Sequence, residues 1–169
     1  MEQIYHQHWE SVFDAAYKRI GDEDIAQDIT QEIFISLWEN REQLQLEGPL
    51  AAYLNGAVKY RVINHFKSLA IRDEHSAVFA SLIAERDTAR ADSRLLLSEM
   101  NKALDAALAE LPEKMRLVLS MSRRQEKSIK EIATELDISV QTVKNHLTAG
   151  MKILRKNLSY VLFLVFLLA

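Results

Sequence analysis

The chain has 169 residues, of which 49% are hydrophobic and 27% are charged, and its formal net charge is −3. That charge argues against a simple nucleic-acid coat, and the absence of cysteine excludes disulfides, thiol nucleophiles and cysteine metal sites. With four glycines, two prolines and no long polar–apolar alternation, the sequence predicts an all-α protein of one or two small domains. The first residues do not resemble a signal peptide, so we expect a cytoplasmic protein.

Charge is distributed unevenly along the chain. Residues 1–47 contain eleven acidic and three basic side chains, whereas residues 48–72 contain four basic side chains and no acid. A second basic excess covers residues 127–157. This pattern suggests two contacts with a polyanion and one with a basic partner, and ordinary solvated surface is the alternative.

The first predicted helix covers residues 5–19 and ends at Gly21, because glycine readily adopts the left-handed conformation of a helix stop. Asp22 can cap a second helix over residues 23–40, whose apolar face consists of Ile25, Ala26, Ile29, Ile33 and Leu37. The opposite face places a large aliphatic side chain among polar ones: Asp24, Asp28, Gln31, Glu32 and Ile35.

Gly48 and Pro49 precede a third predicted helix over residues 50–69, which completes a first domain of residues 1–72. Its inner stripe consists of Leu50, Tyr53, Leu54, Ala57, Val58, Val62 and Phe66. Its far face combines cations, an aromatic ring and an amide: Gly56, Lys59, Tyr60, Ile63, Asn64 and Lys67. These groups suit single-stranded nucleic acid, with Tyr60 as the stacking platform. The alternative is a tyrosine at the core edge among solvated lysines.

Residues 73–94 are small and polar with weak amphipathicity, so we expect a linker there and a second domain over residues 95–158. A helical stripe begins at Leu95, and Pro112 is placed to start another helix. Two further helices, over residues 128–136 and 140–158, are separated by three residues, with Ser139 as the cap of the second. This spacing predicts a helix-turn-helix.

The last of these helices carries the predicted duplex-binding surface. Its inward side chains are Val140, Val143, Leu147, Met151, Leu154 and Leu158, and its outward ones are Gln141, Thr142, Asn145, Thr148, Ala149, Lys152 and Lys156. An α-helix fits the major groove, where Gln141 and Asn145 could contact base edges while lysines hold phosphates. The alternative is a helical hairpin whose polar face meets only water.

Residues 108–158, LAELPEKMRLVLSMSRRQEKSIKEIATELDISVQTVKNHLTAGMKILRKNL, resemble region four of bacterial sigma factors, which binds the minus-thirty-five promoter element. Response regulators end in a similar helix-turn-helix, but the lead-in LPEKMRLVL favours the sigma factor. The residues expected to contact the minus-thirty-five element are Gln141, Thr142, Lys144, Asn145, Thr148 and Lys152.

The segment GDEDIAQDITQEIFISLWENR resembles region two of extracytoplasmic-function sigma factors, in which a D-x-x-Q-E-x-F helix docks on RNA polymerase. Asp28, Gln31, Glu32 and Phe34 match that pattern. The resemblance implies the β′ coiled-coil clamp as partner, and the expected contacts are Asp28, Gln31, Glu32, Ile35 and Trp38. Exposed carboxylates would steer a basic partner, and exposed Ile35 would add apolar area.

The third helix resembles the part of region two that opens DNA and captures the minus-ten element. The residues expected to bind that element are Lys59, Tyr60, Arg61, Asn64 and Lys67. Many relatives carry Asn at the position of Tyr60, in a segment similar to I-A-R-N-x-A-L-D, whereas this chain has AVKYRVINHF. The family's fine base preference is therefore not carried over.

The resemblance covers nearly all of residues 5–158 and implies a sigma factor of the extracytoplasmic-function type, which lends promoter recognition to core RNA polymerase. It implies promoter DNA as partner, an anti-sigma factor as regulator, and no catalysis, cofactor or small-molecule substrate. The five histidines are scattered without a metal-ligand pattern. The alternatives are a response-regulator-like factor that binds duplex DNA without being a polymerase subunit, and a helical adaptor without a DNA role.

Residues 159–169 form a tail with a ten-residue apolar run, YVLFLVFLLA, too short for a bilayer-spanning helix of about 20 residues. We expect it to pack on one of the domains or on a partner helix. The alternatives are a membrane-surface contact and an end that promotes degradation or aggregation.

Overall fold

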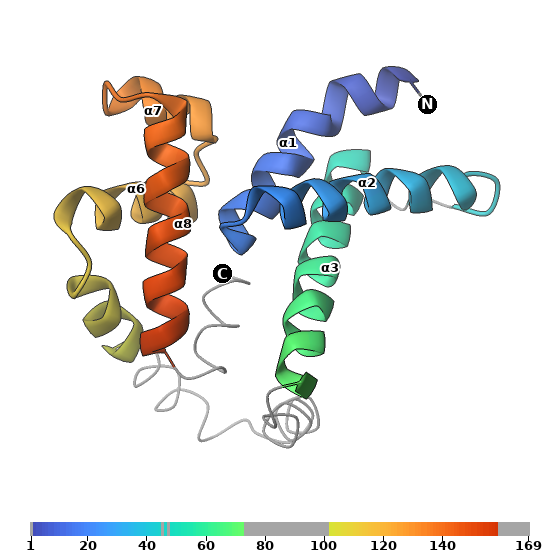
Figure 1. The fold of residues 1–169 in the computed structure, drawn as a ribbon. Coiled ribbons are helices and arrows are strands. Elements are labelled where there is room, and N and C mark those ends of the chain that lie inside the picture. Colours follow the sequence, from blue (N-terminus) through green and yellow to red (C-terminus); the bar gives the residue numbers. More distant parts are fainter. Residues whose placement is uncertain (1, 45, 47, 73–101, 159–169) are drawn as a thin grey trace.

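A computed structural model describes residues 2–44, 46, 48–72 and 102–158, and every regular element in these ranges is a helix. The predicted all-α class is therefore confirmed. The helices form two units that stand side by side, one built from α1–α3 and the other from residues 102–158 (Figure 1). The expected linker, residues 73–94, and the apolar tail, residues 159–169, lie outside the described residues.

Helices α1 (Glu2–Ile20) and α2 (Glu23–Glu39) are joined by the turn that the sequence predicts. Gly21 has a φ of +72°, and its N–H donates to the Tyr17 carbonyl at 2.8 Å. The Asp22 carboxylate accepts a hydrogen bond from the Ile25 N–H at 3.1 Å, as an N-cap does. Helix α1 begins three residues earlier than predicted, and the ring of Tyr5 in its first turns packs edge-on against Phe34 at 5.0 Å.

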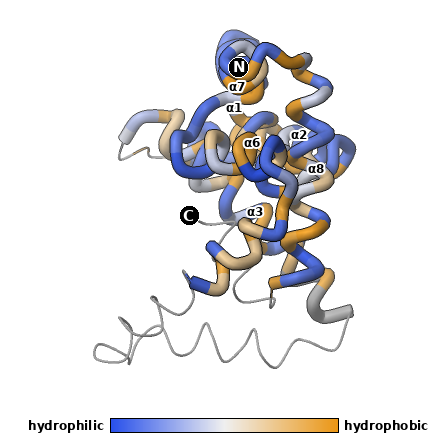
Figure 2. The backbone as a smooth tube through the Cα atoms, turned by 90° about the vertical axis from the view of Figure 1, so that its left-hand side faces the viewer, coloured by the Kyte–Doolittle hydropathy of each residue, from blue (hydrophilic) through white to orange (hydrophobic). Residues whose placement is uncertain are grey.

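Helix α3 (Leu50–Arg72) packs against both α1 and α2. Its buried side chains, Leu54, Val58, Val62 and Phe66, follow the predicted inner stripe. They meet the buried face of α2, which includes Ala26, Ile29, Ile33 and Leu37. Hydrophobic and hydrophilic segments alternate along the backbone of these helices, as amphipathic packing requires (Figure 2).

The second unit contains a helix over residues 102–109, then α6 (Glu113–Arg123), α7 (Ile129–Glu135) and α8 (Val140–Asn157). Ser128 and Glu131 form a capping box at the start of α7. The Ser139 hydroxyl accepts from the Thr142 N–H at 3.0 Å, so the predicted cap of α8 is confirmed.

One inward-facing prediction for α8 is wrong. Val140 is 41% exposed, whereas the next positions of the stripe, Val143, Leu147, Met151 and Leu154, are buried. Val140 is the first residue of the helix, one turn beyond the point where α8 meets the core of its unit. Periodicity places a side chain on a face but does not say where the neighbouring helix ends.

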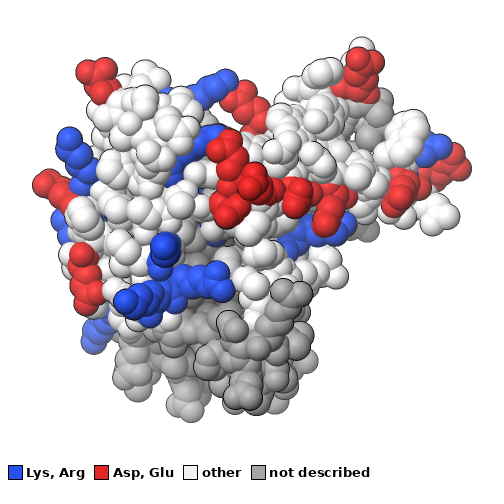
Figure 3. Space-filling view, viewed as in Figure 1, with Lys and Arg blue, Asp and Glu red and all other residues white. Residues whose placement is uncertain are grey.

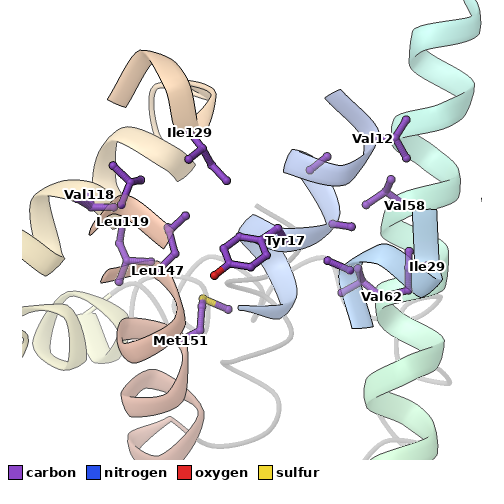
Figure 4. Close-up of a cluster of buried hydrophobic side chains, with 14 of the residues drawn as sticks. Val12, Tyr17, Ile29, Val58, Val62, Val118, Leu119, Ile129, Leu147 and Met151 are labelled. Atoms are coloured by element: carbon purple, nitrogen blue, oxygen red, sulfur yellow. The ribbon is translucent and has the colours of Figure 1, made fainter. Parts of the chain in front are cut away.

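The two units contact each other along a seam, which we define as the contacts of α1 and the start of α2 with α7, α8 and the turn before α7. Helix α1 is the part of the first unit that faces α8. The Tyr17 side chain points from α1 toward Leu147 and Met151 of α8 (Figure 4). A Cβ added at Gly21 would lie 3.1 Å from the Met151 Cβ, so only glycine fits this approach without a shift. Among the described residues, no helix is long and apolar enough to cross a membrane.

Candidate nucleic-acid interface and partner-binding surface

The acidic face of α2, defined as Asp24, Asp28, Gln31, Glu32 and Ile35, is exposed along its length. A row of acidic side chains runs along α2 in the space-filling view (Figure 3). Ile35 is 55% exposed among them, and Trp38 one turn further on is 50% exposed. A surface that combines carboxylates with large apolar side chains suits a basic partner that also covers apolar area.

Two aromatic residues near this face have different roles. Phe34, which matches the sequence pattern, is buried and contacts Tyr5 and Trp9 of α1. Trp38 lies on the surface, where the Arg41 guanidinium stacks over its ring at 4.1 Å. Phe34 therefore supports the packing of α2 on α1, whereas the Trp38 ring remains half exposed on the surface.

The far face of α3 presents an aromatic ring beside polar groups. Tyr60 is 64% exposed, and Lys59, Arg61 and Asn64 are partly exposed. Arg61 donates to the Glu32 carboxylate at 2.5 Å, which links this face directly to the acidic face of α2. Lys67 lies in α3, but its side chain is outside the described part of the structure.

Helix α8 presents amides at its start and cations at its end. Gln141 and Asn145 are exposed. The side-chain N–H of Gln141 donates to the side-chain amide oxygen, Oδ1, of Asn145 at 3.0 Å. Thr142 is partly exposed, and its hydroxyl lies 2.8 Å from that of Ser139. Basic side chains gather over the C-terminal half of α8 (Figure 3), where Lys152, Arg155 and Lys156 are exposed. One helix thus offers groups for base edges and groups for phosphates.

Lys144 and Thr148 lie on the side of α8 that faces the seam. The Lys144 side chain is 15% exposed, its ammonium lies 5.3 Å from the ring centres of both Phe13 and Tyr17, and it contacts Glu23 at 2.7 Å. The hydroxyl groups of Tyr17 and Thr148 are 2.8 Å apart. Lys144 is thus engaged within the protein, whereas Thr148 is exposed and only its hydroxyl is paired across the seam.

Further polar contacts join α1 to the start of α7. The Ile129 N–H donates to Asp14 at 3.1 Å, Lys18 donates to the Lys127 carbonyl at 3.2 Å, and Lys130 pairs with Glu10 at 2.5 Å. Burial raises the pKa of Asp14 and lowers the pKa of Lys18. The sequence predicts no functional surface on α1, because the charged residues of this helix form no recognisable motif.

The described residues contain no group of three or more histidine, aspartate or glutamate side chains arranged to hold a metal ion. No residue of the acidic face of α2 lines either of two cavities in the described structure, one at the seam and one beside α6. The polar groups described above therefore suit macromolecular contacts better than ligation of an ion.

Comparison with known proteins identifies both units. Residues 4–71 match the family described as Sigma-70 region 2, and residues 101–154 match Sigma-70, region 4. The chain is 27% identical over 164 residues to the ECF RNA polymerase sigma factor SigL of Mycobacterium tuberculosis, covering 94% of this chain and 88% of that protein. It is 24% identical over 163 residues to the ECF RNA polymerase sigma factor SigW of Bacillus subtilis, covering 88% and 83%.

Among solved structures, the chain is similar to one from the co-crystal structure of the sigma factor RpoE in complex with the anti-sigma factor NepR from Bartonella quintana. The TM-score is 0.36 at 16% identity, covering 92% of this chain and 94% of that chain.

The region-two match decides between the functions considered from the sequence. A response-regulator-like factor that binds duplex DNA alone has no use for a region-two domain, so that alternative is not favoured. The region-four match likewise leaves no reason to favour an adaptor without a DNA role. The chain belongs to the sigma-70 family and is an RNA polymerase sigma factor of the extracytoplasmic-function type, a non-enzymatic initiation factor that directs core polymerase to promoter DNA.

Proposed function

We propose that the acidic face of α2, extended by Trp38, binds the coiled-coil clamp of the polymerase β′ subunit. Asp28, Gln31 and Glu32 would set the register on a basic partner, and Ile35 and Trp38 would supply the apolar contact. The supporting observation is that both large apolar side chains are at least half exposed beside unburied carboxylates. Such a surface has little reason to face water permanently.

The far face of α3 is the proposed site for the melted minus-ten strand. Tyr60 would stack on an unpaired base, Asn64 would contact a base edge, and the cations Lys59, Arg61 and Lys67 would hold phosphates. The Arg61–Glu32 pair makes this face continuous with the proposed polymerase contact. Docking on polymerase and capture of the strand would therefore use adjacent sides of one rigid unit.

Helix α8 is the proposed duplex-binding element for the minus-thirty-five site. Gln141, Thr142 and Asn145 near its start would contact base edges, and Lys152 would contact phosphates. Lys144 and Thr148 belong to the same surface but are engaged in the seam. We infer that these two contribute to DNA binding only after α8 separates from α1.

The proposed division of the chain follows the two units: residues 1–72 for polymerase and minus-ten binding, a linker over residues 73–94, and residues 95–158 for minus-thirty-five binding. Because its partners are RNA polymerase and chromosomal DNA, we place the protein in the cytoplasm. An anti-sigma factor is a further proposed partner, as the resemblance to extracytoplasmic-function sigma factors implies.

The main support for this function is the exposed Tyr60 ring beside the acidic face of α2. A strand-opening experiment tests whether Tyr60 acts at the minus-ten element. Purified full-length protein and core polymerase are combined with a promoter library, and transcript starts are mapped with the parent and with Tyr60→Ala. We expect Tyr60→Ala to lose most starts on duplex promoters and to keep them on templates that are already melted at the minus-ten element. The matched control is Leu117→Ala, which removes an exposed apolar side chain from α6 in the other unit.

Two results would contradict the assignment. If Tyr60→Ala lost starts equally on duplex and pre-melted templates, the tyrosine would not act in strand opening. If no directed starts appeared with the parent protein on any promoter of the library, the assignment of both DNA-binding faces would fail.

A further inference from the structure

A cavity of about 400 Å³ lies at the seam, between the two units. Its wall is built from α1, the first half of α3, the end of α6 and the start of α7. This volume falls within the range of small-molecule sites, about 300–1,000 Å³. None of the proposed polymerase contacts lines it, and of the proposed DNA contacts only Lys59 does.

Four cations contribute to the wall: Lys18, Arg19, Lys59 and Arg123. Backbone carbonyls hold three of them in place. Arg19 donates to the Ala15 carbonyl at 2.9 Å, Arg123 to the Lys18 carbonyl at 3.1 Å, and Lys18 to the Lys127 carbonyl at 3.2 Å. These neutral acceptors fix the positions of the side chains but do not cancel their charge.

Three of the cations, Lys18, Arg19 and Arg123, lie close enough to repel one another. Burial is the main cause that lowers the pKa of Lys18 and of Arg19, and it also lowers the pKa of Arg123. Arg19 and Arg123 add repulsion at Lys18, and Arg19 adds repulsion at Arg123. Partly desolvated like charges destabilise each other, and a bound anion would relieve this cost.

Two buried donors point to the same ligand chemistry. Ser122 is 4% exposed, and its hydroxyl has no hydrogen-bond partner among the described residues. The Arg19 Nε atom is also buried without such a partner in the described part of the chain. A buried donor without an acceptor costs roughly 1–3 kcal/mol. An oxyanion with several acceptor oxygens could satisfy both donors and the cations together.

Three carboxylates also line the cavity, and two of them are engaged in local structure. Asp14 accepts from the Ile129 N–H at 3.1 Å, and Glu131 accepts from the N–H and the hydroxyl of Ser128, both at 2.7 Å. Asp14 also favours the charged form of Lys18, and the third carboxylate, Glu126, is exposed and favours the charged forms of Lys18 and Arg19. Among the described lining residues, cations and carboxylates are therefore present side by side.

We propose that the seam cavity binds a small phosphate-class oxyanion, held by Lys18, Arg19, Lys59 and Arg123 with the Ser122 hydroxyl. Because these residues come from both units, the bound anion joins α1 to α6. It thereby stabilises the closed arrangement, by which we mean the one in which the two units contact each other along the seam. The lining of the site shares no residue with the proposed polymerase contact or with the proposed duplex-binding surface of α8.

Titration of the full-length protein with inorganic phosphate, pyrophosphate and a nucleoside diphosphate tests the proposal, at ionic strength held constant with sodium chloride. Binding is followed by calorimetry and by thermal unfolding. At ten times the dissociation constant, we expect the unfolding temperature to rise by about 3 °C for at least one of the three anions. The anion that binds most tightly distinguishes an inorganic ligand from a nucleotide.

Variants separate this site from general attraction of anions. Arg19→Gln should weaken binding at least tenfold. Ser122→Ala should weaken it severalfold while leaving the fold intact, since its hydroxyl has no partner to lose among the described residues. Glu126→Gln should strengthen binding. The matched control is Lys114→Gln, which removes an exposed cation of α6 outside the cavity and should have no effect.

The proposal is overturned if none of the three anions stabilises the parent at constant ionic strength. It is also overturned if Lys114→Gln loses as much affinity as Arg19→Gln, or if Ser122→Ala binds as tightly as the parent. The Ser122 result remains decisive even where Arg19→Gln fails to fold.

Discussion

The Nζ atom of Lys144 lies 2.7 Å from Oε1 of Glu23, although the two residues are 121 positions apart in the chain. Lys144 belongs to the proposed duplex-binding surface of α8, and Glu23 belongs to the first turn of α2. If Lys144 binds a DNA phosphate as proposed, the Glu23 carboxylate and the duplex compete for the same ammonium group.

Removing this competitor should improve duplex binding by the free protein. We expect Glu23→Gln to raise affinity for a minus-thirty-five duplex by up to about fivefold, because a partly exposed ion pair contributes roughly 0.2–1 kcal/mol. Fluorescence anisotropy with full-length protein at low salt measures the change. The matched control is Asp24→Asn, which removes the same charge from the same helical turn, where the side chain is exposed. Equal gains from both substitutions would attribute the effect to net charge and contradict the competition.

Gly21→Ala should destabilise the protein and weaken the seam. The added Cβ would sit 3.1 Å from the Met151 Cβ and 3.3 Å from the Thr148 Cα, at a backbone φ of +72°. We expect the free energy of unfolding to fall by about 1–2 kcal/mol, as measured by urea denaturation. Gly56→Ala is the control, because nothing lies within 4 Å of its added Cβ and alanine favours the helix. A loss of stability at Gly56 as large as that at Gly21 would argue against the steric explanation.

Glu32→Lys should abolish association with core polymerase while both units stay folded. The substitution reverses a charge at the centre of the acidic face and breaks the pair with Arg61. Because Glu32 is 55% exposed in that pair, we expect little change in the unfolding transition. Co-purification with core enzyme measures association, and circular dichroism checks the fold. Glu2→Lys, a charge reversal at an exposed position at the start of α1, is the control and should co-purify normally. Retention of Glu32→Lys on polymerase would refute the proposed contact.

Different residues of α8 should determine sequence preference and affinity for the DNA backbone. We expect Asn145→Ala to change the preferred minus-thirty-five sequence, since a base contact discriminates by roughly 1–3 kcal/mol. Lys156→Ala should weaken binding to all sequences and reduce the slope of log affinity against log salt by about 1. Selection from a randomised duplex pool, followed by salt titration, measures both effects. An equal loss by the two variants across every sequence would contradict this division.

The local features of the fold were predictable because neighbouring residues determine them. Gly21 adopts the left-handed stop, and Asp22 and Ser139 accept the hydrogen bonds expected of caps. The buried stripes of α2 and α3 follow from apolar spacing at the helical period. The resemblance to sigma-factor regions two and four rested on longer motifs, each of which lies within one helix or one pair of helices. The family comparisons confirmed that both regions are present.

The seam could not be predicted from the sequence. Tyr17 with Thr148 and Asp14 with the Ile129 N–H join residues more than a hundred positions apart, and such pairs leave no periodic pattern in either segment. The same is true of the cavity, whose four cations come from three helices that meet only in the folded chain. The sequence by itself determined the helices, their caps and the family, because short-range sterics and hydrogen bonds specify them. Only the tertiary structure decided that Lys144 faces a carboxylate instead of solvent, because that depends on how two separately folded units pack.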